Sequence, residues 1–294
     1  MSAEARIGQA PRQAKARGTA FRFALLVCLA ISIGMLGVLL YDVAADGIGK
    51  LKPDFLTAYA SSVAANAGVR AALLGTIWLM VVCAVFIIPV GVATAIYLEE
   101  YADRERWWNR LIEVNIQNLA AVPSIVYGIL GLAFLVRGPF SFGHVVVAGG
   151  LTLGLLVLPV VIIAGREAIR AVPPSIREGS LALGATQWQT IWRQVLPAAV
   201  PGIATGVILA LSRAIGETAP LIMVGAATFV AFDPDLFSQF TALPIQIFDW
   251  ISRPSNDVNN YQELAAGGIL VLMILLLAMN GAAIWLRNRY EQKW

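Results

Sequence analysis

The sequence is poor in charged side chains and in the residues that usually bind metals. Charged residues make up 13% of its 294 residues and apolar residues 59%, whereas soluble domains carry about a quarter charged residues. A chain of this composition cannot cover its apolar surface with polar groups, so we expect much of that surface to face lipid. It has one histidine, His144, and two cysteines, Cys28 and Cys83, which lie inside apolar runs. We therefore predict no metal site and no disulfide.

Two signatures of other functions are also missing. The sequence contains no Gly-x-x-x-x-Gly-Lys-Ser/Thr phosphate loop, the pattern that holds the phosphates of a bound nucleotide in many ATPases. Its net charge of +3 is too small to indicate a nucleic-acid partner. We therefore expect neither an ATPase site nor nucleic-acid binding in this chain.

Six apolar runs reach or approach the ~20 residues that a membrane-spanning helix needs. They cover residues 23–43, 71–98, 119–136, 145–164, 195–224 and 265–286. The first run is too long for the core of a signal peptide, which is the alternative reading of that segment. The third is the weakest, because Pro123 and Ser124 interrupt it. The sequence predicts an all-α membrane protein with six transmembrane helices.

Lysine and arginine indicate the orientation of these spans. Most of them lie in the amino-terminal tail, the second and fourth loops and the carboxyl-terminal tail. Because such residues favour the cytoplasmic side, we place both termini in the cytoplasm. The predicted organisation is a tail at 1–22, a first transmembrane helix at 23–43, a transmembrane domain at 71–286 with a cytoplasmic loop at 166–197 and an outer loop at 225–263, and a second tail at 287–294.

The outer loop contains apolar residues at helical spacing, namely Leu243, Ile247, Phe248 and Ile251. This spacing predicts a short helix at the membrane interface. Such a helix could cover the mouth of a pore or form part of an ordinary packed loop, and the sequence leaves both alternatives open.

Two helix starts are recognisable in the cytoplasmic loop. Ser175 with Glu178, and Thr186 with Gln189, have the spacing of capping boxes, in which two side chains satisfy free backbone amides. Gly184 lies between them, where a helix would end and the chain would turn. We predict a hairpin of two short helices.

One face of the second predicted helix is apolar. Trp188, Ile191, Trp192 and Val195 recur along it at helical spacing. An exposed stripe of this kind needs a partner surface, which could be the rest of the chain, the bilayer interface or another subunit.

Two opposite charges lie within the fifth predicted span. Arg213 and Glu217 are four residues apart, so they share one helix face and can pair. An arginine at the centre of a bilayer costs about 2.5–3.5 kcal/mol on insertion scales, so such residues usually have a partner or a polar pathway. One alternative is an ion pair that only fixes helix packing. The other is an oxyanion pathway, since the guanidinium matches phosphate oxygens. Gly216 and Pro220 would allow a local kink.

The cytoplasmic loop resembles a known family motif. Its Glu-Gly-Ser-x-x-x-Gly run, followed by Leu-Pro, is similar to the Glu-Ala-Ala loop of ABC importer permeases. It departs from that pattern where glycine and serine replace two alanines, and where Gln194 stands in place of an aliphatic residue. The resemblance implies a type I importer architecture whose coupling helices dock on an ATP-hydrolysing subunit. It assigns that coupling to Glu178, Gly179, Ser180, Gly184, Trp188, Leu196 and Pro197.

A second resemblance indicates the transported substrate. The segment 213–221, Arg-Ala-Ile-Gly-Glu-Thr-Ala-Pro-Leu, is similar to the signature of permeases in the bacterial high-affinity phosphate (Pst) system. Its Ala-Pro-Leu ending is typical of the A-type subunit rather than the C-type. Segments 121–128 and 243–250 fit the same family. The resemblance places Arg213, Glu217 and Thr218 on the substrate pathway.

The resemblance also implies partners and a location. It implies a sister permease subunit that forms a heterodimer, two copies of an ATP-binding subunit, and a periplasmic or lipid-anchored phosphate-binding protein. This chain would lie in the bacterial inner membrane as a multi-pass protein and would bind no cofactor, whereas the partner ATPase would use ATP and Mg²⁺. The alternatives are a permease for sulfate or molybdate and an anion-selective secondary transporter, which would predict inverted repeats. A membrane enzyme would need a cluster of reactive side chains at one membrane depth, whereas the predicted spans offer only the pair of Arg213 and Glu217.

Overall fold

The computed structural model describes residues 12–103, 105–255 and 260–290, and these residues form helices and loops without a β-strand. The longest helices are α1 (Arg12–Gly47), α3 (Arg70–Ile96), α6 (Val146–Arg170), α9 (Leu196–Ala214) and α12 (Tyr261–Tyr290). The shorter ones are α2 (Pro53–Thr57), α4 (Trp107–Ala120), α5 (Ser124–Gly131), α7 (Pro174–Ala182), α8 (Gln187–Thr190), α10 (Ala219–Val224) and α11 (Leu243–Ser252). Short 3₁₀ or π turns are η1 (Ile48–Lys50), η2 (Ala64–Asn66), η3 (Tyr97–Tyr101), η4 (Leu132–Val136) and η5 (Ile191–Val195).

The number of membrane spans agrees with the sequence prediction if one bent pair is counted as a span. Within the described residues, five helices are long and apolar enough to cross a bilayer. The sixth, counted in this way, is the pair formed by α4 and by α5 with η4, whose two halves are bent by 105°. The prediction of a single helix over 119–136 is therefore wrong, since α5 begins only after Pro123. Proline lacks a backbone N–H and disfavours helical geometry in the residue before it, which explains a break at this position.

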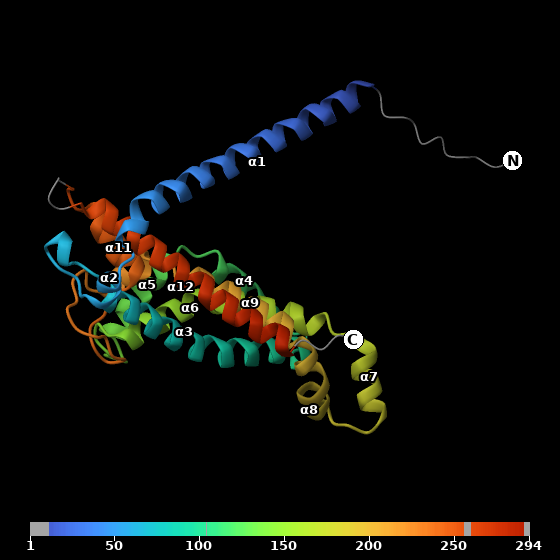
Figure 1. Cartoon of the computed structure of the whole chain (residues 1–294). Helices are drawn as coiled ribbons and strands as arrows, with labels where there is room; N and C mark the ends of the chain where they lie inside the picture. The colour runs from blue at the N-terminus through green and yellow to red at the C-terminus, as the bar shows by residue number, and fades with distance from the viewer. Residues whose placement is uncertain (1–11, 104, 256–259, 291–294) are drawn as a thin grey trace.

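The core of the bundle is built from α3, α6 and α9, which lie side by side (Figure 1). Small residues allow their backbones to approach closely. A Cβ added at Gly154 of α6 would meet the ring of Phe86 at 2.6 Å, and one at Gly206 of α9 would clash with the side chain of Ala164. A continuous apolar cluster fills the space between the three helices. Among its fully or nearly fully buried members are Leu79, Cys83, Ile87, Leu153, Val157, Val161, Ala210 and Ala214.

The first span stands apart from this bundle. α1 is longer than the predicted 23–43 and extends away from the other helices (Figure 1), with its apolar side chains exposed. Its carboxyl-terminal end contacts α12, where a Cβ on Gly47 would lie 2.8 Å from the backbone of Ala266. The loops after α1 and around α11 therefore lie at the same end of the bundle.

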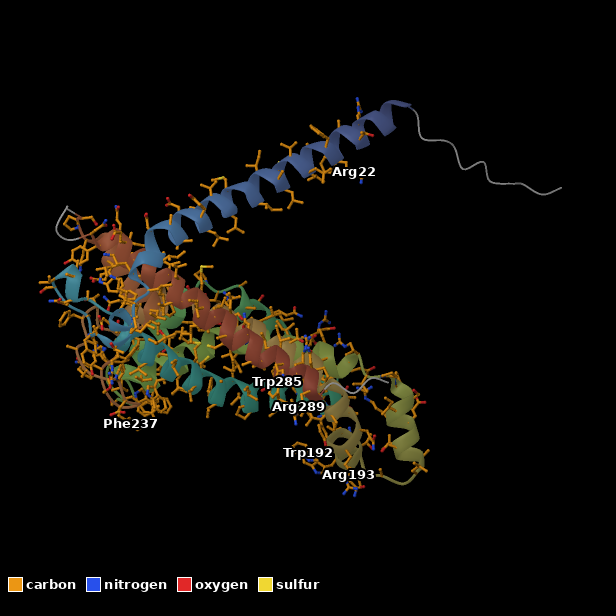
Figure 2. The ribbon with its side chains drawn as sticks, in the orientation of Figure 1. Arg22, Trp192, Arg193, Phe237, Trp285 and Arg289 are labelled. Carbon is orange, nitrogen blue, oxygen red and sulfur yellow. The ribbon has the colours of Figure 1, made fainter. Side chains whose placement is uncertain are left out.

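The opposite end carries the hairpin formed by α7 and α8. Figure 2 shows Trp192, Arg193, Trp285 and Arg289 near this end and Phe237 at the other. Basic side chains near the hairpin are what the predicted orientation requires of the cytoplasmic face.

The outer loop contains the predicted short helix, which is α11. Only one side of this helix has the exposed apolar residues expected of a helix at the membrane interface. Leu243 and Ile247 are buried against α3 and α12, whereas Phe248 and Ile251 are exposed. One side of α11 therefore belongs to the core of this chain.

Candidate functional site

The turn of the cytoplasmic hairpin has the geometry that the sequence predicts. Gly184 has φ +83°, a left-handed conformation that side chains other than glycine rarely adopt. The predicted capping box at Thr186 and Gln189 is confirmed. The backbone N–H of Gln189 donates to Thr186 Oγ1 at 3.3 Å, and the N–H of Thr186 donates to Gln189 Oε1 at 3.0 Å.

Two details of the predicted hairpin are wrong. α7 begins at Pro174 with Pro173 at its cap, so Ser175 lies in the first turn and the Ser175–Glu178 capping box is not formed. Proline preferentially starts a helix because its missing N–H has no partner there in any case. In addition, the second predicted helix is not short and separate. α8, η5 and α9 follow one another without a break and form a single helical segment from Gln187 to Ala214. The second arm of the hairpin is therefore the cytoplasmic end of α9.

The apolar stripe on this arm is divided between the core and the surface. Ile191 and Val195 are buried inside the chain. Trp188 and Trp192 are 57% and 56% exposed, and their rings stack with centroids 5.5 Å apart. The two indoles form a flat apolar surface beside the hairpin turn that remains available to a partner.

The other residues assigned to coupling occupy two places. Glu178 and Gly179 lie on the exposed side of α7, while Ser180 faces the second arm, its Oγ 2.9 Å from Thr190 Oγ1. Leu196 and Pro197 lie at the start of α9, half-buried and further along the helix. The structure thus groups the first three near the turn and sets the Leu-Pro pair apart.

The charged pair lies at a break between helices rather than in the middle of a continuous span. α9 ends at Ala214, one residue after Arg213, and α10 begins at Ala219. The predicted helix over 195–224 is therefore wrong at this point. Gly216 favours helix poorly, and Pro220 removes an N–H donor and restricts the residue before it.

The pair itself is loose and partly exposed. Arg213 Nε lies 3.5 Å from Glu217 Oε1, a distance of an ion pair rather than of a good hydrogen bond. The Arg213 side chain is 44% exposed and the Glu217 side chain 20%. Thr218 is half-buried in the same break.

A second helix break packs against this one. A Cβ on Gly128 of α5 would lie 2.7 Å from Pro220 Cα and 2.8 Å from Met223 Cβ in α10. Beside it, the buried Tyr127 donates its hydroxyl to the carbonyl of Leu119 at 2.8 Å, which bridges the bend between α4 and α5. Sequence reasoning did not bring these segments together. The glycine among larger apolar residues was the available signal, because it permits close backbone approach.

These features define the chain as a helical membrane protein with two broken spans and a cytoplasmic hairpin. It belongs to the family described as binding-protein-dependent transport system inner membrane component, which matches residues 87–293. It is 32% identical to the probable ABC transporter permease protein YqgI of Bacillus subtilis over 279 residues, 91% of this chain and 94% of that protein. It is 37% identical to the phosphate transport system permease protein PstA 1 of Mycobacterium tuberculosis H37Rv over 221 residues, 75% of this chain and 70% of that protein.

Solved structures share the fold at low sequence identity. A chain of a bacterial alginate ABC transporter, solved with an alginate-bound periplasmic protein, is similar with a TM-score of 0.68 and 14% identity, covering 97% of this chain and 99% of that chain. A chain of the MetNI methionine ABC transporter is similar with a TM-score of 0.61 and 18% identity, covering 76% and 96%. The fold is therefore that of a type I ABC importer permease.

Proposed function

We propose that this chain is the permease subunit that carries inorganic phosphate across the bacterial inner membrane, driven by ATP hydrolysis in a partner subunit. The observation that carries the proposal is the partly exposed guanidinium of Arg213 at the α9–α10 break. A relative at 37% identity is named as a phosphate transport permease, which supports phosphate as the anion.

The exposure of Arg213 is difficult to reconcile with a packing role. A charged side chain facing hydrocarbon costs about 2.5–3.5 kcal/mol, so the exposed part of this side chain needs a polar surrounding. An ion pair with Glu217 would supply that polar surrounding only if the two side chains enclosed each other. Here the Nε–Oε1 distance is 3.5 Å and almost half of the arginine side chain is open. A polar path between this chain and a second permease subunit would surround the exposed part of the guanidinium with water and polar groups.

The guanidinium also fits the proposed substrate chemically. It stays charged at all physiological pH values and offers parallel N–H donors that match two oxygens of a phosphate. Glu217 would hold the guanidinium in place between transport events, and the Thr218 hydroxyl adds a neutral donor in the same break. Sulfate and molybdate present similar oxygens, so they are the nearest alternative substrates.

The hairpin supports the second half of the proposal. Glu178, Gly179 and the stacked Trp188 and Trp192 form an exposed surface around the Gly184 turn. We infer that this surface docks on an ATP-binding subunit, which supplies the ATP and Mg²⁺ chemistry. The assembly would contain two copies of that subunit, a sister permease and a phosphate-binding protein on the outer side. An anion-selective secondary transporter would leave this surface without a use.

Three variants of the charged pair test the pathway role in the assembled complex. Arg213→Gln should abolish phosphate uptake. Arg213→Lys should retain part of it, because lysine keeps the charge but lacks the parallel N–H donors of the guanidinium. The double variant Arg213→Gln/Glu217→Gln leaves no stranded charge, so it should assemble and still fail to transport. Uptake of phosphate, sulfate and molybdate and the yield of assembled complex are measured for each.

Arg287→Gln serves as the matched control, because Arg287 donates to Thr205 Oγ1 at 3.2 Å at the cytoplasmic end of the bundle, away from the break. It should leave uptake intact. Full phosphate uptake by the double neutral variant would reduce Arg213 to a packing residue. Stronger uptake of sulfate or molybdate than of phosphate by the parent chain would overturn the assigned substrate while leaving the permease assignment.

A further inference from the structure

An amide side chain on α12 contacts the last turn of α9. Asn280 is the only amide or charged side chain in the sequence between Glu263 and Arg287, the apolar part of α12. The hydroxyl of Ser212 donates to Asn280 Oδ1 at 2.6 Å, and it also lies 2.7 Å from the carbonyl oxygen of Ile208 one turn earlier in α9. Polar side chains within spans form such contacts with a neighbouring helix, because lipid offers them no partner.

A second polar contact joins the same two helices, which lie side by side (Figure 1). Arg287 of α12 donates from Nη1 to Thr205 Oγ1 of α9 at 3.2 Å. Thr205 precedes Ser212 by seven residues, and their partners on α12 follow in the reverse order at the same spacing, as two antiparallel helices require. Seven residues correspond to ~10 Å along a helix. Only the contact of Asn280 therefore lies beside the break between α9 and α10.

Apolar packing between α12 and the core follows one row. Its members are half-buried, namely Leu272, Leu275, Leu276 and Met279. On the core side, the last turn of α9 is buried through Ala210 and Ala214, whose single methyl groups interlock little with their neighbours. Such contacts tolerate small rotations of a helix about its axis, whereas a short hydrogen bond is sensitive to both distance and angle. A polar residue in an apolar seam therefore fixes how the two helices are aligned.

The rotation of α9 at this point matters because Arg213 directly follows Ser212. α9 ends at Ala214, and the chain is not helical again until α10 begins at Ala219, so no further turn holds this end in place. Neighbouring residues of an α-helix point about 100° apart, which turns Arg213 away from α12. It shares an exposed stripe of α9 with Leu209, one turn before it.

We propose that Asn280 is a positioning residue for transport, which directs the Arg213 side chain into the break between α9 and α10. Its hydrogen bond with Ser212 sets the rotation of the last turn of α9, and thereby places the guanidinium where the anion passes. Asn280 acts through Arg213 and does not touch the anion. This inference rests on the pathway role of Arg213 proposed above and extends it to a residue of another span.

The test removes the contact without leaving an unpaired polar group. In Asn280→Leu a side chain of similar size replaces the amide, and the Ser212 hydroxyl keeps the carbonyl of Ile208 as its acceptor. Phosphate uptake per assembled complex should fall about 3- to 18-fold, which corresponds to the ~0.6–1.7 kcal/mol that hydrogen bonds between membrane helices contribute. The yield of complex should not change. If it falls, Ser212→Ala removes the same contact with a smaller change in volume.

Thr205→Val is the matched control. It removes the other polar contact between the same two helices, while Arg287 keeps Asn288 Oδ1 as an acceptor at 3.0 Å. Because this contact lies about two turns from the break, uptake should remain at the parent level.

Two further variants separate positioning from a general loss of packing. The exchange Ser212→Asn/Asn280→Ser places the same two polar groups on opposite helices, so it should restore uptake. In the Arg213→Lys background, Asn280→Leu should reduce uptake by a smaller factor than in the parent. The flexible lysine depends less on the rotation of the helix, and residues that act through one another are not additive.

A thiol at position 213 reports the rotation of this turn without depending on the anion. Arg213→Cys is introduced after Cys28 and Cys83 are replaced by alanine, and the complete complex in lipid nanodiscs is labelled with a membrane-impermeant thiol reagent. Asn280→Leu should lower the labelling rate by about 3- to 18-fold as well, because the exposed orientation becomes less populated. Thr205→Val should leave the rate unchanged.

Three results would overturn the positioning role. One is unchanged uptake and labelling in Asn280→Leu. Another is an equal loss of uptake in Thr205→Val, since both contacts would then only hold α12 against α9. The third is a loss that the exchange does not restore while labelling stays at the parent rate, since Asn280 would then act on the anion directly. These results leave the pathway role of Arg213 standing, whereas full uptake by Arg213→Gln/Glu217→Gln refutes that role and the positioning role with it.

Discussion

The contact between the two broken spans gives a prediction with a magnitude. In Gly128→Ala, the new Cβ would lie 2.7 Å from Pro220 Cα and 3.0 Å from the Pro220 carbonyl oxygen. Both are backbone atoms, which cannot rotate away as a flexible side chain could. Ordinary contact begins at 3.4 Å, so α5 and α10 would have to separate by about 0.7 Å.

Overpacking of this kind typically costs about 1–3 kcal/mol. Because α10 begins two residues after Glu217, a shift of α10 would also displace the charged pair at its start. We therefore expect Gly128→Ala to lower the melting temperature of the purified complex and to reduce phosphate uptake by more than the loss of assembled complex explains. Both quantities are measured on the same preparations.

Gly281→Ala is the control for this experiment. Gly281 lies in the membrane helix α12, and a Cβ there would meet nothing within 4 Å in this chain. Alanine is also the better helix former, so stability should stay the same or rise slightly. Unchanged stability and uptake in Gly128→Ala would show that α5 and α10 do not pack as the structure has them.

Three further predictions concern the two faces of the protein. Gly184→Val should weaken ATP-coupled uptake at normal membrane abundance, because a left-handed residue with a side chain costs about 1–2 kcal/mol, and normal coupling would refute the role of the turn. In a cysteine-free background, Ser255→Cys should react with an impermeant thiol reagent from outside and Gln187→Cys should not, and the reverse pattern would overturn the topology. Hydrogen bonding by Arg70 lowers the pKa of Asp233 from 3.8. The ion pair between Arg70 and Asp233 therefore stabilises the outer loop at neutral pH, and this stabilisation is lost as the pH falls through the lowered pKa of Asp233. The difference in melting temperature between the parent and Asp233→Asn should disappear under the same acidification, and a difference that persists there would contradict the ion pair.

Local patterns in the sequence were sufficient for the spans and for the hairpin turn. Apolar runs of bilayer length identified where the long helices lie, because a spanning helix must satisfy its backbone internally and cover itself with apolar side chains. Gly184 and the Thr186–Gln189 box were predictable for a similar reason, since each depends on residues within one turn of the chain.

Contacts between distant segments were decided only by the tertiary structure. The 105° bend at Pro123 and the end of α9 beside Arg213 depend on whether neighbouring helices support a kink or a full break, and a proline permits both. The attachment of Glu100 to Arg177 joins residues 77 positions apart, and that of Arg70 to Asp233 joins residues 163 apart. No periodicity in the sequence encodes such pairs. They form because folding brings the ends of separate helices to the same face of the membrane. A mostly buried charge such as that of Glu100 needs an opposite charge beside it, whereas the exposed pair of Arg70 and Asp233 is also solvated.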